Sequence, residues 1–88
     1  MNDSDEVLMA RVAAGEAAAL EQLFDRYAGL LLGVLTRILR ERGAAEEALQ
    51  ETFWRVWSKS ESFDPARGAF KPWLFSVARR LAIDDIRR

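Results

Sequence analysis

The residues best suited to chemistry in this chain form a binding surface rather than a catalytic centre. Five polar or aromatic side chains recur at helical spacing between positions 46 and 57: Glu47, Gln50, Glu51, Trp54 and Arg55. A tryptophan flanked by amide and carboxylate groups is typical of a protein-binding hot spot, because the rigid ring supplies contact area and its neighbours fix the register. The alternatives are that Trp54 folds back over the edge of the core and that Glu47 only stabilises the helix dipole.

A second set of side chains, downstream of the first, could bind nucleic acid. Its members are basic or hydrogen-bonding residues in a loop and in the helix after it: Lys59, Asp64, Arg67, Lys71, Arg79 and Arg80. Cations bind phosphates, and polar groups can read a base displaced from its stack. The alternatives are an ordinary ordered loop anchored by Phe63 and Phe70, and arginines that only complement the dipole at a helix C-terminus.

No catalytic arrangement is recognisable. The chain has no cysteine and no histidine, which removes thiolate chemistry and imidazole as a metal ligand or general base. The carboxylate pairs Glu46/Glu47 and Asp84/Asp85 are sequence neighbours, so they diverge around a helix, and no glycine-rich phosphate loop is present. We therefore expect a protein that is not an enzyme and that uses no cofactor, metal or small-molecule substrate.

Charge is unevenly distributed along the chain, although the net charge is only −1. Residues 1–51 carry ten acidic side chains against five arginines, a net charge of −5. Residues 52–88 carry eight basic side chains against four acidic ones, a net charge of +4. A dipolar chain of this kind can offer one end to phosphates while the other end repels them. Chance segregation on a solvated surface is the alternative.

Hydrophobic periodicity predicts a short helix followed by a long one. Residues 4–14 form the short helix, with Asp3 and Glu6 as a capping box and Gly15 as its stop. Apolar residues at three- and four-residue steps then continue as a long helix that ends at Gly43.

Two glycines interrupt the long helical pattern. Gly29 and Gly33 each cost about 1 kcal/mol relative to alanine inside a helix. They indicate close approach of another helix or a slight bend, with local slack in a long helix as the alternative.

Two further helices of medium length are expected at about residues 44–58 and 72–88, joined by a loop over residues 59–69. Asp64 precedes a proline and is therefore extended, and Gly68 permits a positive φ. These two positions predict an ordered loop rather than a flexible linker.

The elements together predict an all-α fold, a compact bundle of about four helices in one domain over residues 1–88. Half of the residues (50%) are hydrophobic, which is enough for a core without disulfides or metals. The longest apolar run, Ala28–Leu35, is far shorter than the roughly 20 residues that cross a bilayer. The N-terminus is acidic where a signal peptide would be basic. We expect a cytoplasmic protein without membrane contact.

Several spaced motifs resemble region 2 of the bacterial extracytoplasmic-function (ECF) sigma factors of the sigma-70 family. They are ALEQLFDRY at 19–27, EALQETF at 47–53, VW at 56–57, FDPARGAF at 63–70, WL at 73–74 and AR at 78–79. The resemblance implies a helical domain that binds the clamp helices of the β′ subunit of core RNA polymerase. It also implies recognition and melting of the promoter −10 element in transcription initiation.

The resemblance assigns roles to the two sets of side chains. The polymerase-binding surface of the family falls on Glu47, Gln50, Glu51, Trp54 and Arg55. The family's loop that captures an unstacked base of the non-template strand falls on residues 59–71, and Asp64, Arg67 and Lys71 are the expected contacts.

The promoter-reading helix of the family falls on residues 72–88. Arg79 and Arg80 would meet backbone phosphates or duplex edges there. Phe70 and Trp73 match positions that we expect to be largely structural.

The chain departs from the family pattern at two places. It stops at Arg88, before the linker and the helix-turn-helix domain that reads the −35 element, so we expect either a trimmed product or a protein that acts alone with weak promoter affinity. Ala69 stands where the family often has a serine or threonine cap, which weakens the start of the last helix by about 1 kcal/mol unless another group substitutes.

The sequence leaves two other functions as alternatives to the sigma-factor role. One is a helical protein-interaction module without a direct DNA role, for example one held by an anti-sigma factor over the Trp54 face. The other is an ordinary helix-turn-helix that binds duplex DNA. The connection over residues 59–69 is too long for the tight turn of that motif.

Overall fold

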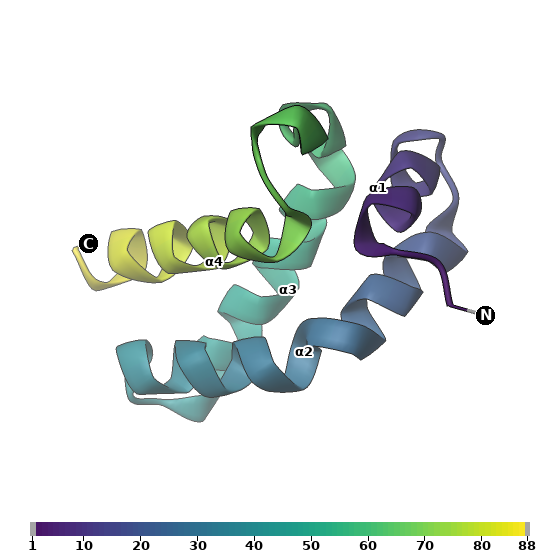
Figure 1. Cartoon of the computed structure of the whole chain (residues 1–88). Coiled ribbons are helices and arrows are strands. Elements are labelled where there is room, and N and C mark those ends of the chain that lie inside the picture. Colours follow the sequence, from purple (N-terminus) through teal and green to yellow (C-terminus); the bar gives the residue numbers. More distant parts are fainter. Residues whose placement is uncertain (1, 88) are drawn as a thin grey trace.

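The computed structural model describes residues 2–87, and all regular structure within them is helical. Met1 and Arg88, the predicted end of the last helix, lie outside the described residues. The elements are α1 (Asp5–Ala13), α2 (Ala17–Leu39), α3 (Arg42–Ser58), the short 3-10 helices η1 (Ser60–Ser62) and η2 (Pro65–Arg67), and α4 (Phe70–Ile86) (Figure 1). The predicted all-α fold, with an ordered loop before the last helix, is confirmed. Among residues 2–87, no helix is both long and apolar enough to cross a membrane.

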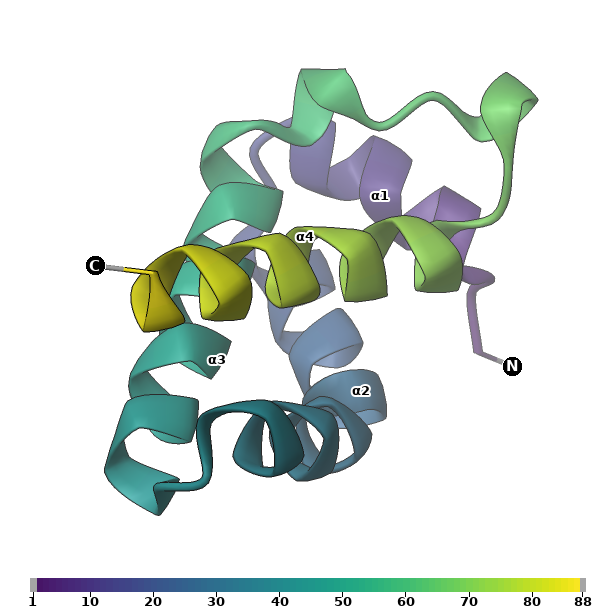
Figure 2. The ribbon, with the colours of Figure 1, turned by 90° about the vertical axis from the view of Figure 1, so that its left-hand side faces the viewer.

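The long helix α2 is the centre of the packing. It contacts α1, α3 and α4, and Figure 2 shows α4 lying across α3 and α2. All four α-helices contribute apolar side chains that are fully shielded from solvent: Leu8, Leu23, Leu31, Leu35, Val56, Phe70 and Leu74. Burying each such side chain stabilises the fold by about 1.5–3 kcal/mol. The core therefore fixes the orientation of the outer faces of α3 and α4.

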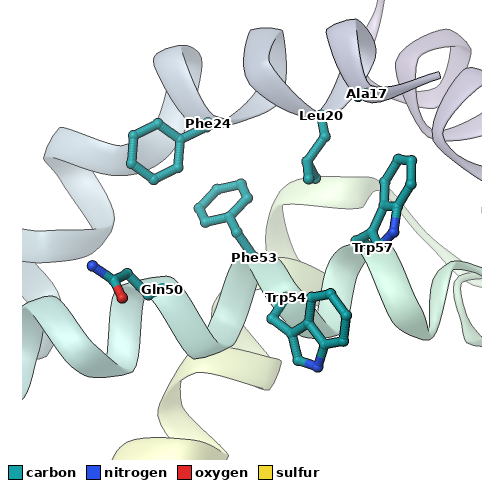
Figure 3. Close-up of a pocket in the computed structure, with 7 residues that line it drawn as sticks. All are labelled: Ala17, Leu20, Phe24, Gln50, Phe53, Trp54 and Trp57. Carbon is teal, nitrogen blue, oxygen red and sulfur yellow. The ribbon is translucent and has the colours of Figure 1, made fainter.

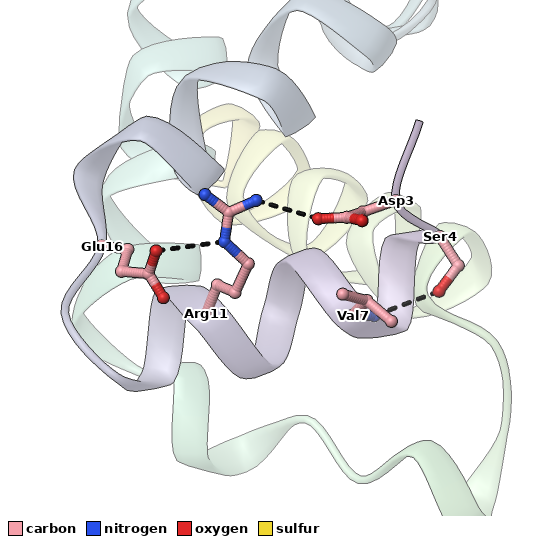
Figure 4. Close-up of polar contacts among 5 residues, drawn as sticks. All are labelled: Asp3, Ser4, Val7, Arg11 and Glu16. Atoms are coloured by element: carbon pink, nitrogen blue, oxygen red, sulfur yellow. Dashed lines mark hydrogen bonds and ion pairs between the residues drawn. The ribbon is translucent and has the colours of Figure 1, made fainter. Parts of the chain in front are cut away.

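The start of α1 is capped differently from the prediction. Ser4, not Asp3, is the N-cap, because its hydroxyl accepts a hydrogen bond from the Val7 amide at 3.2 Å (Figure 4). Asp3 instead binds the Arg11 guanidinium at 2.9 Å, and Glu16 binds the same guanidinium at 3.1 Å. The predicted capping box is therefore wrong, since its aspartate pairs with a cation two turns away.

The junction between α2 and α3 also differs from the prediction. The long helix ends at Leu39, and not at Gly43, because Arg40 adopts a left-handed conformation with φ of 60°. Glu41 then caps α3, with its carboxylate accepting hydrogen bonds from the amides of Gly43 (2.9 Å) and Ala44 (2.6 Å). Gly43 therefore lies in the first turn of α3, and the capping carboxylate sets the boundary rather than the glycine.

The two glycines inside α2 do not mark close approach of another helix. Gly29 and Gly33 are both exposed, and a methyl group on either would meet no neighbouring atom within 4 Å. Figure 1 shows the axis of α2 changing direction near its middle, which agrees with the predicted bend. The Thr36 hydroxyl donates to the Leu32 carbonyl at 2.7 Å, a contact that also favours bending.

The connection from α3 to α4 is ordered, as predicted, and passes over α1 (Figure 2). Asp64 is extended (φ −119°) and Gly68 has a positive φ of 153°. The last helix begins at Phe70, two residues before the predicted Pro72. It can begin there because the Glu6 carboxylate accepts a hydrogen bond from the Phe70 amide at 3.1 Å, so Glu6 caps α4 rather than α1.

Candidate functional site

The outer face of α3 presents all five side chains predicted to bind a protein, and all five are exposed. Four of them surround one shallow hollow: Glu47, Gln50, Glu51 and Trp54. Trp54 is 59% exposed, so the alternative in which it folds over the core is wrong. The opposite face of α3 is held by buried Leu49, Phe53 and Val56, and helical spacing then leaves the polar set pointing outward.

The fifth residue of the set, Arg55, does not line this hollow. Its side chain lies beside α4 instead. It lines a hollow of about 290 Å³ whose other charged members are all acidic: Glu47, Glu51, Asp84 and Asp85. The acidic surface of α3 therefore continues onto the last turn of α4. Sequence reasoning missed this continuation, because it counted Asp84 and Asp85 in the basic half of the chain.

An apolar groove runs along the seam between α2 and α3, next to the acidic face. It has a volume of about 440 Å³ and is lined by Ala17, Leu20, Phe24, Gln50, Phe53, Trp54 and Trp57. Figure 3 shows Leu20 and Phe24 facing α3, and the rings of Phe24 and Phe53 meet edge to face with centroids 5.1 Å apart. Phe24 is 38% exposed and Trp57 is half-buried, although both side chains are large and apolar. They remain accessible because only α2 and α3 line this seam.

A pocket of about 360 Å³ lies between the α3–α4 connection and the first turns of α4. We call it the loop pocket, and it is lined by Ser62, Phe63, Asp64, Arg67, Gly68, Ala69, Pro72, Trp73 and Ser76. Asp64 and Arg67 thus meet at one site. Lys71 does not join them, because its Nζ lies 5.9 Å from the ring centroid of Phe75. Trp73, which was expected to be structural, is half-buried and forms part of the wall.

A basic hollow of about 240 Å³ adjoins the loop pocket. It is lined by Arg55, Lys59, Ser62, Trp73, Val77, Arg80 and Leu81. Ser62 and Trp73 line both cavities, so the two share a wall. Within residues 2–87, none of the three cations forms an ion pair, which leaves their charge available to a ligand. Arg79 is exposed but lines neither cavity.

A cluster of aromatic rings packs against the walls of the loop pocket. Phe70 is fully buried, and its ring centroid lies 5.8 Å from that of Phe63, 5.8 Å from that of Trp73 and 5.9 Å from that of Tyr27. The Tyr27 hydroxyl donates a hydrogen bond to Asp5. Burial, and then this bond, raises the pKa of Tyr27 to about 12. The pocket wall is therefore tied through Phe70 to residues of α1 and α2.

Comparison with known proteins identifies the family. The model of the sigma-70 region 2 family matches residues 23–88. The ECF RNA polymerase sigma factor SigK of Mycobacterium sp. (strain KMS) is 37% identical over 82 residues, which is 93% of this chain and 42% of the relative. SigK of Mycobacterium tuberculosis (strain ATCC 25618 / H37Rv) is 35% identical over 93% of this chain and 44% of the relative.

The chain spans less than half the length of these curated relatives. The family match begins inside α2, so α1 and the cap that it gives to α4 precede the matched residues. The family match covers most of the chain and includes the outer face of α3, the loop pocket and the basic hollow. The predicted resemblance is confirmed, and the chain belongs to the sigma-70 region 2 family.

Proposed function

We propose that this domain binds core RNA polymerase and recognises and helps melt the promoter −10 element during transcription initiation. The observation that carries the proposal is the loop pocket, whose aromatic walls and polar groups stand beside a basic hollow. Proteins that hold single strands combine stacking surfaces with cationic grooves in this way. Membership of the sigma-70 region 2 family supports the same role.

The loop pocket would receive a base unstacked from the non-template strand. Unstacking and unpairing a base costs a few kcal/mol, and stacking on an aromatic side chain returns about 1–3 kcal/mol. Phe63 and Trp73 supply rings for this stacking. Asp64 can accept hydrogen bonds from base edges and Arg67 can donate them, so the pair could distinguish one base from another.

The basic hollow would hold the sugar-phosphate backbone next to that base. Arg55, Lys59 and Arg80 converge there from the end of α3 and the middle of α4. Lys71 and Arg79, which line neither cavity, would meet phosphates further along the strand. Such contacts give affinity and register but no sequence information.

The outer face of α3 would bind the clamp helices of the β′ subunit. Four carboxylates around the neighbouring hollow give this side of the molecule a negative potential. That potential suits a basic partner and would speed the association. The proposed contacts are Glu47, Gln50, Glu51 and Trp54, together with Arg55, which stands at the border between this surface and the basic hollow.

The role implies a location and an absence of chemistry. Sigma factors are not a family of catalytic proteins, and we propose no catalytic activity for this domain. Its proposed partners, core polymerase and promoter DNA, place it in the cytoplasm.

A second candidate function is a protein-interaction module, for example one held by an anti-sigma factor. The apolar groove between α2 and α3 favours it, because five large apolar side chains line this groove, Trp54 among them. A helix with an apolar face could occupy such a groove. The two functions are compatible, since an occupant of the groove would approach the proposed polymerase surface.

Sequencing of selected single strands tests the main proposal. Core polymerase with the domain is incubated with single strands that carry a randomised window, and bound strands are recovered. We expect an enriched motif that polymerase alone does not select. Arg67→Ala should relax one position of that motif, whereas Lys59→Ala should weaken all strands alike. Arg37→Ala, which removes an exposed cation from α2, is the control. Absence of enrichment would favour the interaction module.

A further inference from the structure

The last helix begins without a cap of its own. Its N-cap residue, Ala69, makes no side-chain hydrogen bond, because alanine has no acceptor. The Glu6 carboxylate takes that place from 64 residues away, accepting a hydrogen bond from the Phe70 amide at 3.1 Å. A carboxylate at this point also interacts favourably with the positive end of the helix dipole.

The residue before Glu6 anchors α1 to a different helix. Asp5 pairs with the Arg26 guanidinium at 2.8 Å and accepts a hydrogen bond from the Tyr27 hydroxyl. Two consecutive carboxylates in the first turn of α1 thus hold α2 and α4 separately. Leu8, Met9 and Val12 are buried in the core, so α1 is a fixed support for both contacts.

The capped residue is also the one that supports the loop pocket. Phe70 packs against Phe63 and Trp73, with ring centroids 5.8 Å away in both cases, and those two rings line the pocket. Helix α1 also contacts η1, the short helix that carries Ser62. A shift of the Phe70 backbone would therefore move two aromatic walls of the pocket while leaving the outer face of α3 in place.

We propose that Glu6 is a positioning residue for the loop pocket, acting through the start of α4 on a site that it does not line. The inference rests on the proposed function for its consequence, the binding of an unstacked base. Its structural part, the cap on α4, is independent of that function. Glu6 itself precedes the residues that the family match covers.

Three variants and a control test the proposal on the domain bound to core polymerase. Glu6→Ala removes the cap, Glu6→Gln keeps an acceptor oxygen, and Glu6→Ala combined with Ala69→Ser offers a local cap. The backbone at Ala69 is already extended (φ −75°, ψ 159°), which suits serine at this position. Glu21→Ala removes an exposed carboxylate from α2 as the control.

Strand binding and hydrogen exchange are the readouts. The strand is the motif selected above with 2-aminopurine at the base expected in the pocket. We expect Glu6→Ala to weaken strand binding and to speed amide exchange at Phe70, each by about five- to tenfold, as for a lost helix cap. Polymerase binding should stay unchanged. Glu6→Gln should recover most of both losses. The double variant should recover strand binding but not the slow exchange at Phe70, because a serine at position 69 accepts a hydrogen bond from the Lys71 amide instead. Glu21→Ala should show neither loss.

Two results would overturn the proposal. One is faster exchange at Phe70 in Glu6→Ala with strand binding at the wild-type level. The other is an equal loss of strand and polymerase binding that Ala69→Ser does not reverse, because that pattern means that the whole fold has weakened. If the wild-type domain selects no strand, the proposed function fails, while the exchange rates at Phe70 in Glu6→Ala and Glu6→Gln still decide whether Glu6 caps α4.

Discussion

The outer face of α3 and the loop pocket are built in opposite ways. The α3 face follows from the register of a single helix, whose buried side holds Leu49, Phe53 and Val56. The loop pocket joins residues of η1, η2 and α4, and it rests on Phe70, which Glu6 of α1 caps. The first surface therefore depends on local geometry, whereas the second depends on contacts between distant segments. Perturbations of the core should therefore damage the two surfaces unequally.

Removal of the Phe70 ring should destabilise the fold more than any other change proposed below. Phe70→Ala should lower the free energy of unfolding by about 3–5 kcal/mol, because a fully buried ring is lost and a cavity remains. Urea denaturation followed by circular dichroism measures the loss. Phe70→Leu keeps most of the volume and should cost less. A loss below about 1 kcal/mol for the alanine variant would show that the pocket does not rest on this ring.

A smaller effect on stability is expected at Trp54, which lies on the outer face of α3. Trp54→Ala should change the free energy of unfolding by no more than about 0.5 kcal/mol, since the side chain is 59% exposed. It should weaken polymerase binding by about 2 kcal/mol or more if the residue is a hot spot. Titration of labelled polymerase gives the affinity. Strong destabilisation by this change would contradict the local character of the α3 face.

Two neighbouring arginines of α4 allow a finer comparison within the proposed nucleic-acid-binding surface. Arg80 lines the basic hollow and Arg79 does not. Arg80→Ala should reduce the slope of log affinity against log salt concentration for a single strand by about 0.7, the value for one phosphate contact. Arg79→Ala should reduce it less. Fluorescence anisotropy across a salt series measures both slopes, and equal slopes would remove the special role of the hollow.

Tyr27 should show the smallest effect, a change in stability that begins only at alkaline pH. Its pKa is raised to about 12 in the folded protein, mainly by burial and then by the hydrogen bond to Asp5, against an ordinary value of 10. Folding therefore favours the protonated phenol, and this contribution is complete below about pH 10 and lost as pH rises towards 12. The chain has one tyrosine, so tyrosinate absorbance follows this group alone. Asp5→Asn should shift the titration towards lower pH.

Local patterns predicted the parts of the molecule that depend on local geometry. Helical spacing was sufficient to place Gln50 and Trp54 on an exposed face, and Asp64 and Gly68 correctly indicated an ordered loop. The junction of α2 and α3 was misplaced because Gly43 is a familiar stop signal. A left-handed Arg40 and a capping Glu41 have weaker signatures in sequence.

Contacts between distant segments were beyond sequence reasoning. The proximity of Asp84 to Glu47 depends on how α4 crosses α3, which periodicity does not specify. Glu6 was assigned to the wrong helix because its spacing from Asp3 fits a capping box. Ala69 was the signal that could have identified the correct helix. A helix whose N-cap is alanine has no side-chain acceptor of its own, which implies that a carboxylate or hydroxyl from elsewhere in the chain lies near its start.

Under the proposed function, the wall shared by the loop pocket and the basic hollow limits the form of DNA that could bind. Ser62 and Trp73 border both cavities, so one short stretch of strand would place a base and a nearby phosphate on either side of the same two residues. In a paired duplex the base faces inward and is stacked between its neighbours, so the two cavities could not be filled together. The domain would then select melted over paired DNA by shape alone, before any hydrogen bond distinguishes one base from another.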